Sequence, residues 1–221
     1  MGGRRSPCLP FMQTPRIRSL HLIVICLSLV LNGCSKKLSS DIDRGYITDT
    51  KGNTYSLRVM KDGRQWLTQN LNINVPGSYC YNDSLDNCSR YGRLYTWKAA
   101  REACEMLGKG WHLPTGDEWE QMVSYYGGVR SDAGQDGKEA YKRLIPGGDS
   151  EFNIVFGGTR DPSGSYRRAE AHGFFWTASE YDAGHAWFYN LGKGGQLVNR
   201  HSDGEKSSAI SVRCINRANP K

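Results

Sequence analysis

The sequence lacks the short motifs that mark the commonest catalytic and phosphate-binding sites. It has no Gly-x-Ser-x-Gly elbow and no His-Glu-x-x-His helix, the local signatures of α/β-hydrolases and zinc proteases. Its "GGVRSDAG" stretch lacks the Lys-Ser/Thr ending of a phosphate-binding loop, and no internal repeat or low-complexity block is visible. The motifs therefore point to no catalytic residue, no metal ligand and no cofactor.

Acidic residues are absent from the first 33 positions, where four arginines accompany the apolar run "LHLIVICLSLVL" (20–31). A basic segment, about a dozen apolar residues and small residues before a cleavage point are typical of a secretory signal peptide. The run ends in "LNGC" (31–34), which resembles the lipobox of bacterial lipoproteins. This resemblance implies that residues 1–33 are removed and that Cys34 carries lipid such as palmitate.

Two alternatives remain open at this end of the chain. The run could be a short membrane anchor that is not cut, although a spanning helix needs about 20 apolar residues. The true start could be Met1 or Met12. On the lipoprotein interpretation, polar residues 34–45 form a tether, and the protein is exported and anchored to the bacterial membrane. Ser35 is not an inner-membrane retention signal of the Asp type, which favours the outer membrane.

Charge is modest once the signal peptide is set aside. The whole chain has a formal net charge of +7, but residues 34–221 hold 25 basic and 22 acidic residues, a balance of +3. Such a balance gives no argument for nucleic acid or for an acidic partner. The remaining 188 residues are enough for one domain with a full core.

Cys-x-x-Cys pairs are also missing, although four cysteines follow Cys34. An even number of cysteines in an exported chain favours disulfides, and four allow three pairings. The spacing favours Cys80–Cys88 as a local clip and Cys104–Cys214 as a long staple. The alternative is a zinc site, which an oxidising compartment disfavours.

Turn and periodicity signals predict short elements in the first half of the domain. Segments "YITD", "NTYSLRVM" and "RQWLTQNL", separated by turn-forming residues, predict a strand meander over 46–73. "SYCYNDSLDNC" (78–88) is expected to be a loop closed by its cysteines, without the spacing of a calcium loop. Apolar residues at steps of three and four predict a helix over 93–107.

A second helix begins in "LPTGDEWEQMVSYYGG" (113–128). Thr115 and Glu118 have the spacing of a capping box, and the acids of the first turn suit the helix dipole. An apolar stripe then predicts the buried face, formed by Trp119, Met122, Val123 and Tyr126. Every acid here has a structural role, so His112 is expected to pack or hydrogen-bond at the helix start.

The second half is expected to be richer in strands. The stretch "GKEAYKRLIPGG" (137–148) predicts a short helix or strand, and "EFNIVFGGTRD" (151–161) predicts a strand running into a turn. Segments 174–179, 185–191, 196–202 and 209–216, joined by short glycine-bearing turns, predict an antiparallel sheet. The expected fold is an α+β domain of two helices packed on short antiparallel sheets and stapled by disulfides.

Several long motifs resemble one family. "RQWLTQNLN", "GSYCYNDSLDNCSRYGRLYTWKAA", "GWHLPTGDEWEQ" and "FWTASE…AISVRCIN" are similar to the Fibrobacter succinogenes major paralogous domain, over residues 46–216, with a tail at 217–221. That family occurs in exported bacterial proteins and implies no reaction. "WHLPTGDEWE" and "VRC" also resemble formylglycine-generating-enzyme-type domains, whose wider C-type-lectin-like fold has a disulfide from the first helix to the last strand.

These features favour non-catalytic binding of a glycan or protein at the cell envelope. Trp187 and Tyr189 are the first candidates for an aromatic binding surface, although apolar residues on both faces of "HAWFYNL" indicate burial. The triplets of calcium-dependent lectins are absent.

Two alternatives stay open. An enzyme of the formylglycine type would need a pair of free, reactive cysteines late in the chain, where only Cys214 occurs. A structural envelope component would present an exposed apolar patch without a pocket.

Overall fold

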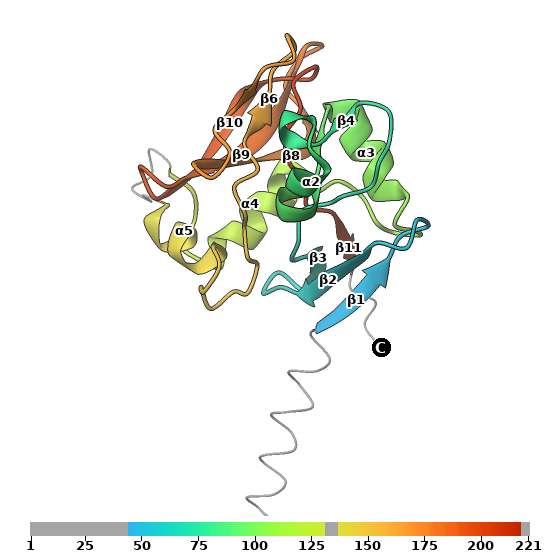
Figure 1. The fold of residues 1–221 in the computed structure, drawn as a ribbon. Coiled ribbons are helices and arrows are strands. Elements are labelled where there is room, and N and C mark those ends of the chain that lie inside the picture. Colours follow the sequence, from blue (N-terminus) through green and yellow to red (C-terminus); the bar gives the residue numbers. More distant parts are fainter. Residues whose placement is uncertain (1–43, 131–136, 218–221) are drawn as a thin grey trace, which may run out of the picture. The chain divides into compact units, whose positions relative to one another are not determined.

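The computed structural model describes residues 44–130 and 137–217. The predicted signal peptide, Cys34, most of the tether and residues 218–221 of the tail lie outside the described residues. Within the described ranges, no helix combines the length and apolar character needed to cross a bilayer. Figure 1 shows the strands of residues 44–67 at the bottom of the view, the strands of residues 172–205 at the top, and the helix of residues 85–91 at the front.

The N-terminal strands form the meander that the sequence predicts. Strands β1 (Arg44–Thr48), β2 (Thr54–Val59) and β3 (Arg64–Leu67) pair antiparallel in order. Strand β11 (Ile215–Arg217) adds to β3, which gives the order β1-β2-β3-β11. Both ends of the domain therefore belong to one sheet, and β1 begins two residues before the predicted boundary at 46.

The predicted C-terminal sheet is confirmed for three of its four strands. Strands β8 (His172–Glu180), β9 (His185–Gly192) and β10 (Leu197–Glu205) pair antiparallel in the order β10-β9-β8. The prediction for 209–216 is wrong. Residues 209–211 make only isolated bridges to three other segments, and the chain then crosses to the first sheet as β11.

The two predicted helices are present with shorter bounds. Helix α3 (Trp97–Glu105) starts later than residue 93, because β5 (Leu94–Tyr95) pairs with β4 (Ser78–Tyr79) first. Helix α4 (Gly116–Ser124) opens with the predicted capping box: the Thr115 hydroxyl accepts from the Glu118 amide at 3.2 Å, and the Glu118 carboxylate accepts from the Thr115 amide at 2.9 Å. All four residues of its predicted apolar stripe are buried.

Two further α-helices give four in the described residues, where two were expected. The cysteine loop contains the 3₁₀ turn η1 (Tyr81–Asp83) and α2 (Leu85–Tyr91), and α5 (Lys138–Leu144) lies against β10. The strand predicted in "EFNIVFGGTRD" is wrong over 151–156. Glu151 and Asn153 both have φ of 54°, a left-handed conformation that no strand accommodates. Only a short hairpin of β6 (Thr159–Arg160) and β7 (Tyr166–Arg167) follows.

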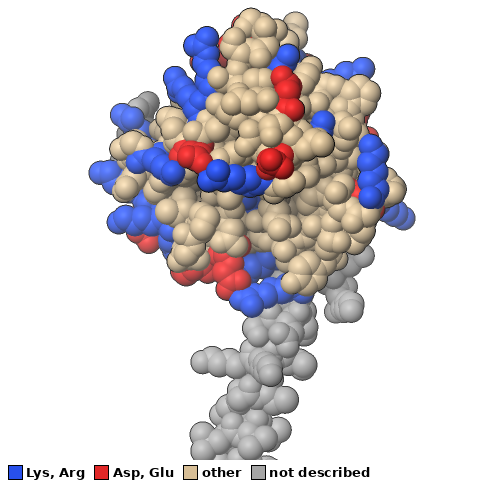
Figure 2. Space-filling view, in the orientation of Figure 1, with Lys and Arg blue, Asp and Glu red and all other residues tan. Residues whose placement is uncertain are grey.

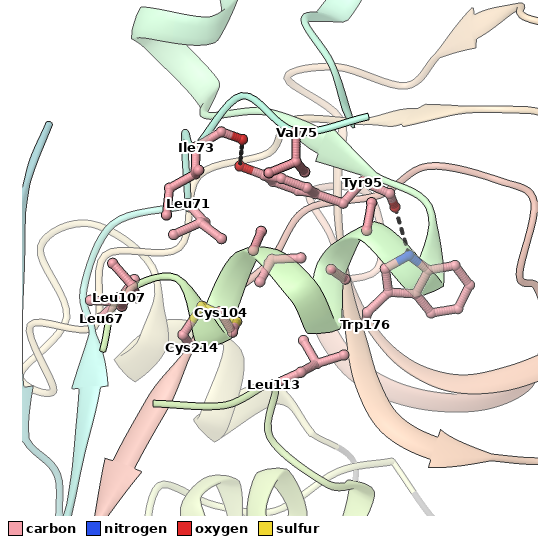
Figure 3. Packing of buried hydrophobic residues seen from close by; sticks show 14 of the residues in the cluster. Leu67, Leu71, Ile73, Val75, Tyr95, Cys104, Leu107, Leu113, Trp176 and Cys214 are labelled. Atoms are coloured by element: carbon pink, nitrogen blue, oxygen red, sulfur yellow. Dashed lines mark hydrogen bonds between the residues drawn. A yellow bond between two sulfur atoms is a disulfide. The ribbon is translucent and has the colours of Figure 1, made fainter. Parts of the chain in front are cut away.

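Both predicted disulfides are present. Cys80 bonds to Cys88, and Cys104 on α3 bonds to Cys214, just before β11. The long staple lies inside the first of two core clusters (Figure 3), together with Leu71, Ile73 and Tyr95. There the Tyr95 hydroxyl donates to the Ile73 carbonyl at 2.9 Å, and Trp176 Nε1 donates to the Tyr95 carbonyl at 2.8 Å. A second cluster surrounds Trp66, Trp119 and Phe152. The domain is therefore α+β and disulfide-stapled.

Candidate functional site

Two adjoining cavities open beside α2, and we treat them as one groove because they share Arg90, Tyr91 and Val155. Their volumes are about 450 and 410 Å³, each inside the roughly 300–1,000 Å³ range of small-molecule pockets. We call the first the polar half; its lining includes Asn53, Ser56, Thr68, Gln69, Asn72 and Asn153. We call the second the apolar half; its lining includes Tyr141, Ile145, Pro146, Ile154 and Phe156.

The segment that follows β3 supplies one wall of the polar half. Leu67, Leu71 and Ile73 point into the first core cluster and are fully buried. Gln69 and Asn72, which lie between them in sequence, line the cavity. Alternation of apolar and amide residues in "LTQNLNI" thus sorts the leucines to the core and the amides to the groove.

Asn70 forms part of the floor of the polar half, and Arg213 supports it from behind. Asn70 Nδ2 donates to the Tyr91 carbonyl at 2.8 Å, and Asn70 Oδ1 accepts from Arg213 Nε at 2.8 Å. Arg213 also donates to the carbonyls of Leu67, Phe152 and Asn153 at 3.1, 2.8 and 2.8 Å. One buried guanidinium therefore joins three segments that lie far apart in the sequence.

The Arg213 charge is balanced by carbonyl dipoles and by aromatic rings. Its guanidinium lies 4.9 Å from the Phe152 ring centroid and forms no ion pair with a carboxylate in the described part of the chain. Burial lowers the pKa of Arg213 to about 9, so the group remains charged at neutral pH.

Helix α2 supplies the opposite wall, and three features hold it there. The Cys80–Cys88 disulfide ties it to the preceding turn, and the Asn70 side chain binds its last carbonyl. The helix ends at Gly92, which has φ of +73°. A Cβ at this position would lie 2.7 Å from Asn70 Cβ and 2.8 Å from the Leu71 carbonyl oxygen, so only glycine permits the close approach.

Charged side chains at the two ends of the polar half form ion pairs with one another. At the junction of the halves, Glu170 accepts from the Tyr91 hydroxyl at 2.7 Å and pairs with Arg90 at 2.7 Å. These two contacts, the Tyr91 hydrogen bond first, lower the pKa of Glu170. At the far end of the polar half, Glu151 pairs with Arg58 at 2.7 Å and with Arg44.

The wall between these ends is uncharged. Figure 2 shows a largely tan surface between α2 and β2, which means that few lysine, arginine or acidic side chains lie there. Two polar atoms of this wall have no partner among the described residues: Asn72 Oδ1, which is buried, and Gln69 Nε2, whose companion oxygen accepts from the Ser56 amide at 2.9 Å. Gln69 is exposed, so its Nε2 can donate to a ligand directly, whereas the buried Asn72 Oδ1 can accept only after its side chain turns toward the cavity.

The apolar half is built on aromatic and aliphatic side chains. Tyr141 stacks on Phe156 with ring centroids 6.3 Å apart, and Ile154 is almost fully buried beneath them. Lys193 lies at the rim, with Nζ 5.9 Å from the Phe156 ring centroid. This half combines apolar surface with a charged rim formed by Arg90, Glu170 and Lys193.

Comparison with family models matches residues 50–216 to the Fibrobacter succinogenes major domain. The chain belongs to this family. The match covers both halves of the groove and both disulfides. Comparisons with curated proteins and with solved structures found no match.

Within this Fibrobacter succinogenes major domain, the two aromatic candidates have different environments. Tyr189 is fully buried: its ring stacks on Trp119 at 5.2 Å, and its hydroxyl donates to the Gly116 carbonyl at 3.1 Å. It therefore contributes no surface to a ligand. Trp187 is half-buried beneath the Arg200 guanidinium, 4.3 Å from its ring centroid, and lies outside the groove.

His112, the histidine near the start of α4, is not part of the groove. His112 Nδ1 donates to the Gly110 carbonyl, 3.0 Å away, and the ring lies 3.4 Å from the Glu118 carboxylate, as expected at the helix start. Cys34 lies outside the described residues. Among residues 44–130 and 137–217, no group of three or more His, Cys, Asp or Glu side chains is placed to hold a metal ion. Sequence reasoning missed the groove, although the amide-rich "TQNLN" was a visible signal for it.

Proposed function

We propose that this protein is an exported, lipid-anchored binding protein, and that the polar half of its groove holds an uncharged part of the ligand by hydrogen bonds. The uncharged amide and hydroxyl wall, with its surrounding charges already paired, carries the proposal. A charged ligand would have to displace Glu170 from Arg90 or Glu151 from Arg58. A sugar or a peptide backbone can instead bind Gln69 Nε2, and Asn72 Oδ1 once that side chain turns toward the cavity, without breaking an ion pair.

We infer a non-catalytic role. All four cysteines of the described residues are bonded in pairs, so thiol chemistry of the formylglycine type would require opening a disulfide. Glu170, the one carboxylate that lines the groove, is already bound to Tyr91 and Arg90. A free thiol at Cys214 in the native protein would favour the enzyme instead.

We also propose that the fold is of the C-type-lectin-like kind. Support comes from the α3-to-β11 staple, from antiparallel sheets at both ends of the domain and from the pairing of its first and last strands in one sheet. An experimental structure that superimposes on that fold only locally would contradict this assignment.

A pair of tryptophan variants on α2 tests the binding role. Ser89 is exposed and lines the polar half, so Ser89→Trp places an indole over the groove. Leu85→Trp is the matched control, because Leu85 is 75% exposed on the same helix and lines neither half. We expect the full chain to bind glycans or capped peptides on arrays, and Ser89→Trp to weaken binding by at least about tenfold, or 1.4 kcal/mol. Equal binding by both variants would place the site elsewhere.

An intact-mass measurement tests the anchor. We expect a chain that begins at Cys34 and carries acyl groups, and that gains the mass of four hydrogen atoms on reduction of its two disulfides. Fractionation should recover it with the outer membrane. A mass that retains residues 20–31 without lipid would contradict the lipoprotein proposal.

A further inference from the structure

We propose that the ligand of the groove is an extended peptide segment of a partner protein, with a large apolar side chain in the apolar half and an acidic group beside it. This inference rests on the proposed binding function and narrows it from glycan or protein to protein. It depends on the continuity of the two halves, on the side chains that line each half and on the charge at the rim.

The junction of the two halves allows one ligand to cross both. Arg90, Tyr91 and Val155 line each cavity, so a ligand that leaves the polar half at these residues enters the apolar half directly. Tyr91 is fixed there by its hydrogen bond to Glu170, and Arg90 by its ion pair with the same carboxylate. The passage between the halves is therefore bounded by side chains that hold one another in place.

The polar half suits a peptide main chain. Each peptide unit presents one N–H donor and one carbonyl acceptor, and both must be paired when they are removed from water. Gln69 Nε2 offers a free donor in this wall, and the buried Asn72 Oδ1 becomes an acceptor when its side chain turns toward the cavity. A glycan can also use these atoms, so the polar half alone does not choose between the two ligands.

The apolar half favours a peptide over a glycan. Its Tyr141–Phe156 stack, Ile145 and Ile154 offer apolar surface to whatever enters. A sugar hydroxyl buried against them would lose its water without gaining a partner, which is unfavourable. A leucine or phenylalanine side chain would instead remove apolar area from water on both surfaces.

The rim adds a preference for negative charge beside that apolar side chain. Lys193 is exposed and forms no ion pair with a carboxylate in the described residues, and the neighbouring Glu170 is already bonded to Arg90 and Tyr91. With Arg90, Lys193 and Glu170 together, the rim carries one uncompensated positive charge. An aspartate, a glutamate or a C-terminal carboxylate next to the apolar residue complements it.

Positional-scanning octapeptides test the inference. The full chain, purified in mild detergent, is exposed to an immobilised library with capped termini and, in parallel, to a glycan array. We expect one library position to select Leu, Ile or Phe, with Asp or Glu preferred next to it. Ile145→Ser should weaken binding of the selected peptide by about tenfold, or 1.4 kcal/mol.

Two variants at exposed lysines test the inference without disturbing the core. Lys193→Gln should weaken binding of the acidic peptide about threefold at low salt, as expected for an exposed ion pair, and leave a peptide with Gln in place of the acid unchanged. Lys142→Gln is the matched control, because Lys142 is exposed and lines neither half.

The outcomes separate this inference from the proposed function. If glycans bind, with binding lost in Ser89→Trp and unchanged in Ile145→Ser, the groove is a binding site but its ligand is not a peptide. Peptides selected without an apolar preference would also overturn the inference. If neither library binds in a way that Ser89→Trp weakens, both the inference and the proposed function fail.

Discussion

Arg213 Nε donates a hydrogen bond to Asn70 Oδ1 at 2.8 Å, so the last segment of the domain holds the floor of the groove from behind. The same guanidinium binds the carbonyls of Phe152 and Asn153, in the segment that replaces the expected strand. The shape of the polar half therefore depends on a residue that no ligand touches.

Arg213→Met should lower the free energy of unfolding by at least about 3 kcal/mol, because three buried acceptors and one part-buried acceptor lose their donor. Urea unfolding followed by tryptophan fluorescence measures this. Arg217→Met, on the exposed end of β11, is the control and should change stability by no more than about 0.5 kcal/mol. A loss below about 1 kcal/mol in Arg213→Met would contradict the proposed role of this side chain.

Removing the long staple should cost more stability than removing the short one. Cys104 and Cys214 are 110 residues apart in sequence, and Cys80 and Cys88 are 8 apart. By the chain-entropy argument, double substitution to alanine should lower the free energy of unfolding by about 5 kcal/mol for the long staple and about 2.5 kcal/mol for the short one. Equal losses would show that loop length does not govern these bonds.

The short disulfide should be reduced first. Cys80 and Cys88 keep a small exposed fraction, whereas Cys104 and Cys214 are fully buried. Arg93 Nη1 lies 3.4 Å from both sulfurs of the short bond, where its charge favours a leaving thiolate. Stepwise addition of a dithiol, with alkylation and mass spectrometry, should label Cys80 and Cys88 first, and Arg93→Gln should slow that step. Earlier labelling of Cys104 would contradict this order.

Asp49 should make the domain sensitive to acid. Its carboxylate accepts from the Lys51 and Asn53 amides at 2.9 and 3.0 Å and from the Tyr55 hydroxyl at 2.9 Å. Burial alone would raise the pKa of Asp49, but these hydrogen bonds, together with one from the Asn53 side chain, outweigh it and lower the pKa below 3.8. The unfolded chain therefore binds the proton more tightly, so this stabilisation is present above about pH 4 and is lost as pH falls through the folded pKa.

Asp49→Asn measures that contribution. We expect a loss of about 2 kcal/mol at pH 7 and a weaker dependence of stability on pH below about pH 4 than in the parent chain. Asp86→Asn, at an exposed position of α2, makes the same change of charge and is the control. Identical pH profiles for the parent chain and Asp49→Asn would refute the prediction.

Local and covalent features were predictable from the sequence. The capping box of Thr115 and Glu118 depends on residues three apart, and its geometry is as predicted. Both disulfides followed from cysteine spacing and from the family resemblance. These predictions succeeded because each depends on few residues and on chemistry that tertiary packing does not override.

The groove was not predictable, because tertiary contacts create it. Its walls come from β2, from the segment after β3, from α2, from residues 153–156 and from residues 141–146 at the end of α5, with Glu170 and Lys193 at the rim. The composition of residues 151–156 predicts a strand, yet Glu151 and Asn153 adopt a left-handed backbone conformation, and Arg213 binds the carbonyls of Phe152 and Asn153. For "HAWFYNL", alternation correctly separated the two faces of β9, but apolar residues on both gave no sign that Tyr189 lies against Trp119.

Side-chain amide resonances of the isotope-labelled full chain give the most direct test that the groove is the binding site. On titration with the tightest-binding array ligand, the account predicts shifts in the amide groups of Gln69, Asn72 and Asn153, which line the polar half. Asn87 and Asn199, which line neither half, should not move. Shifts confined to Asn199 or to the Trp187 indole, with Gln69 and Asn72 unchanged, would contradict it.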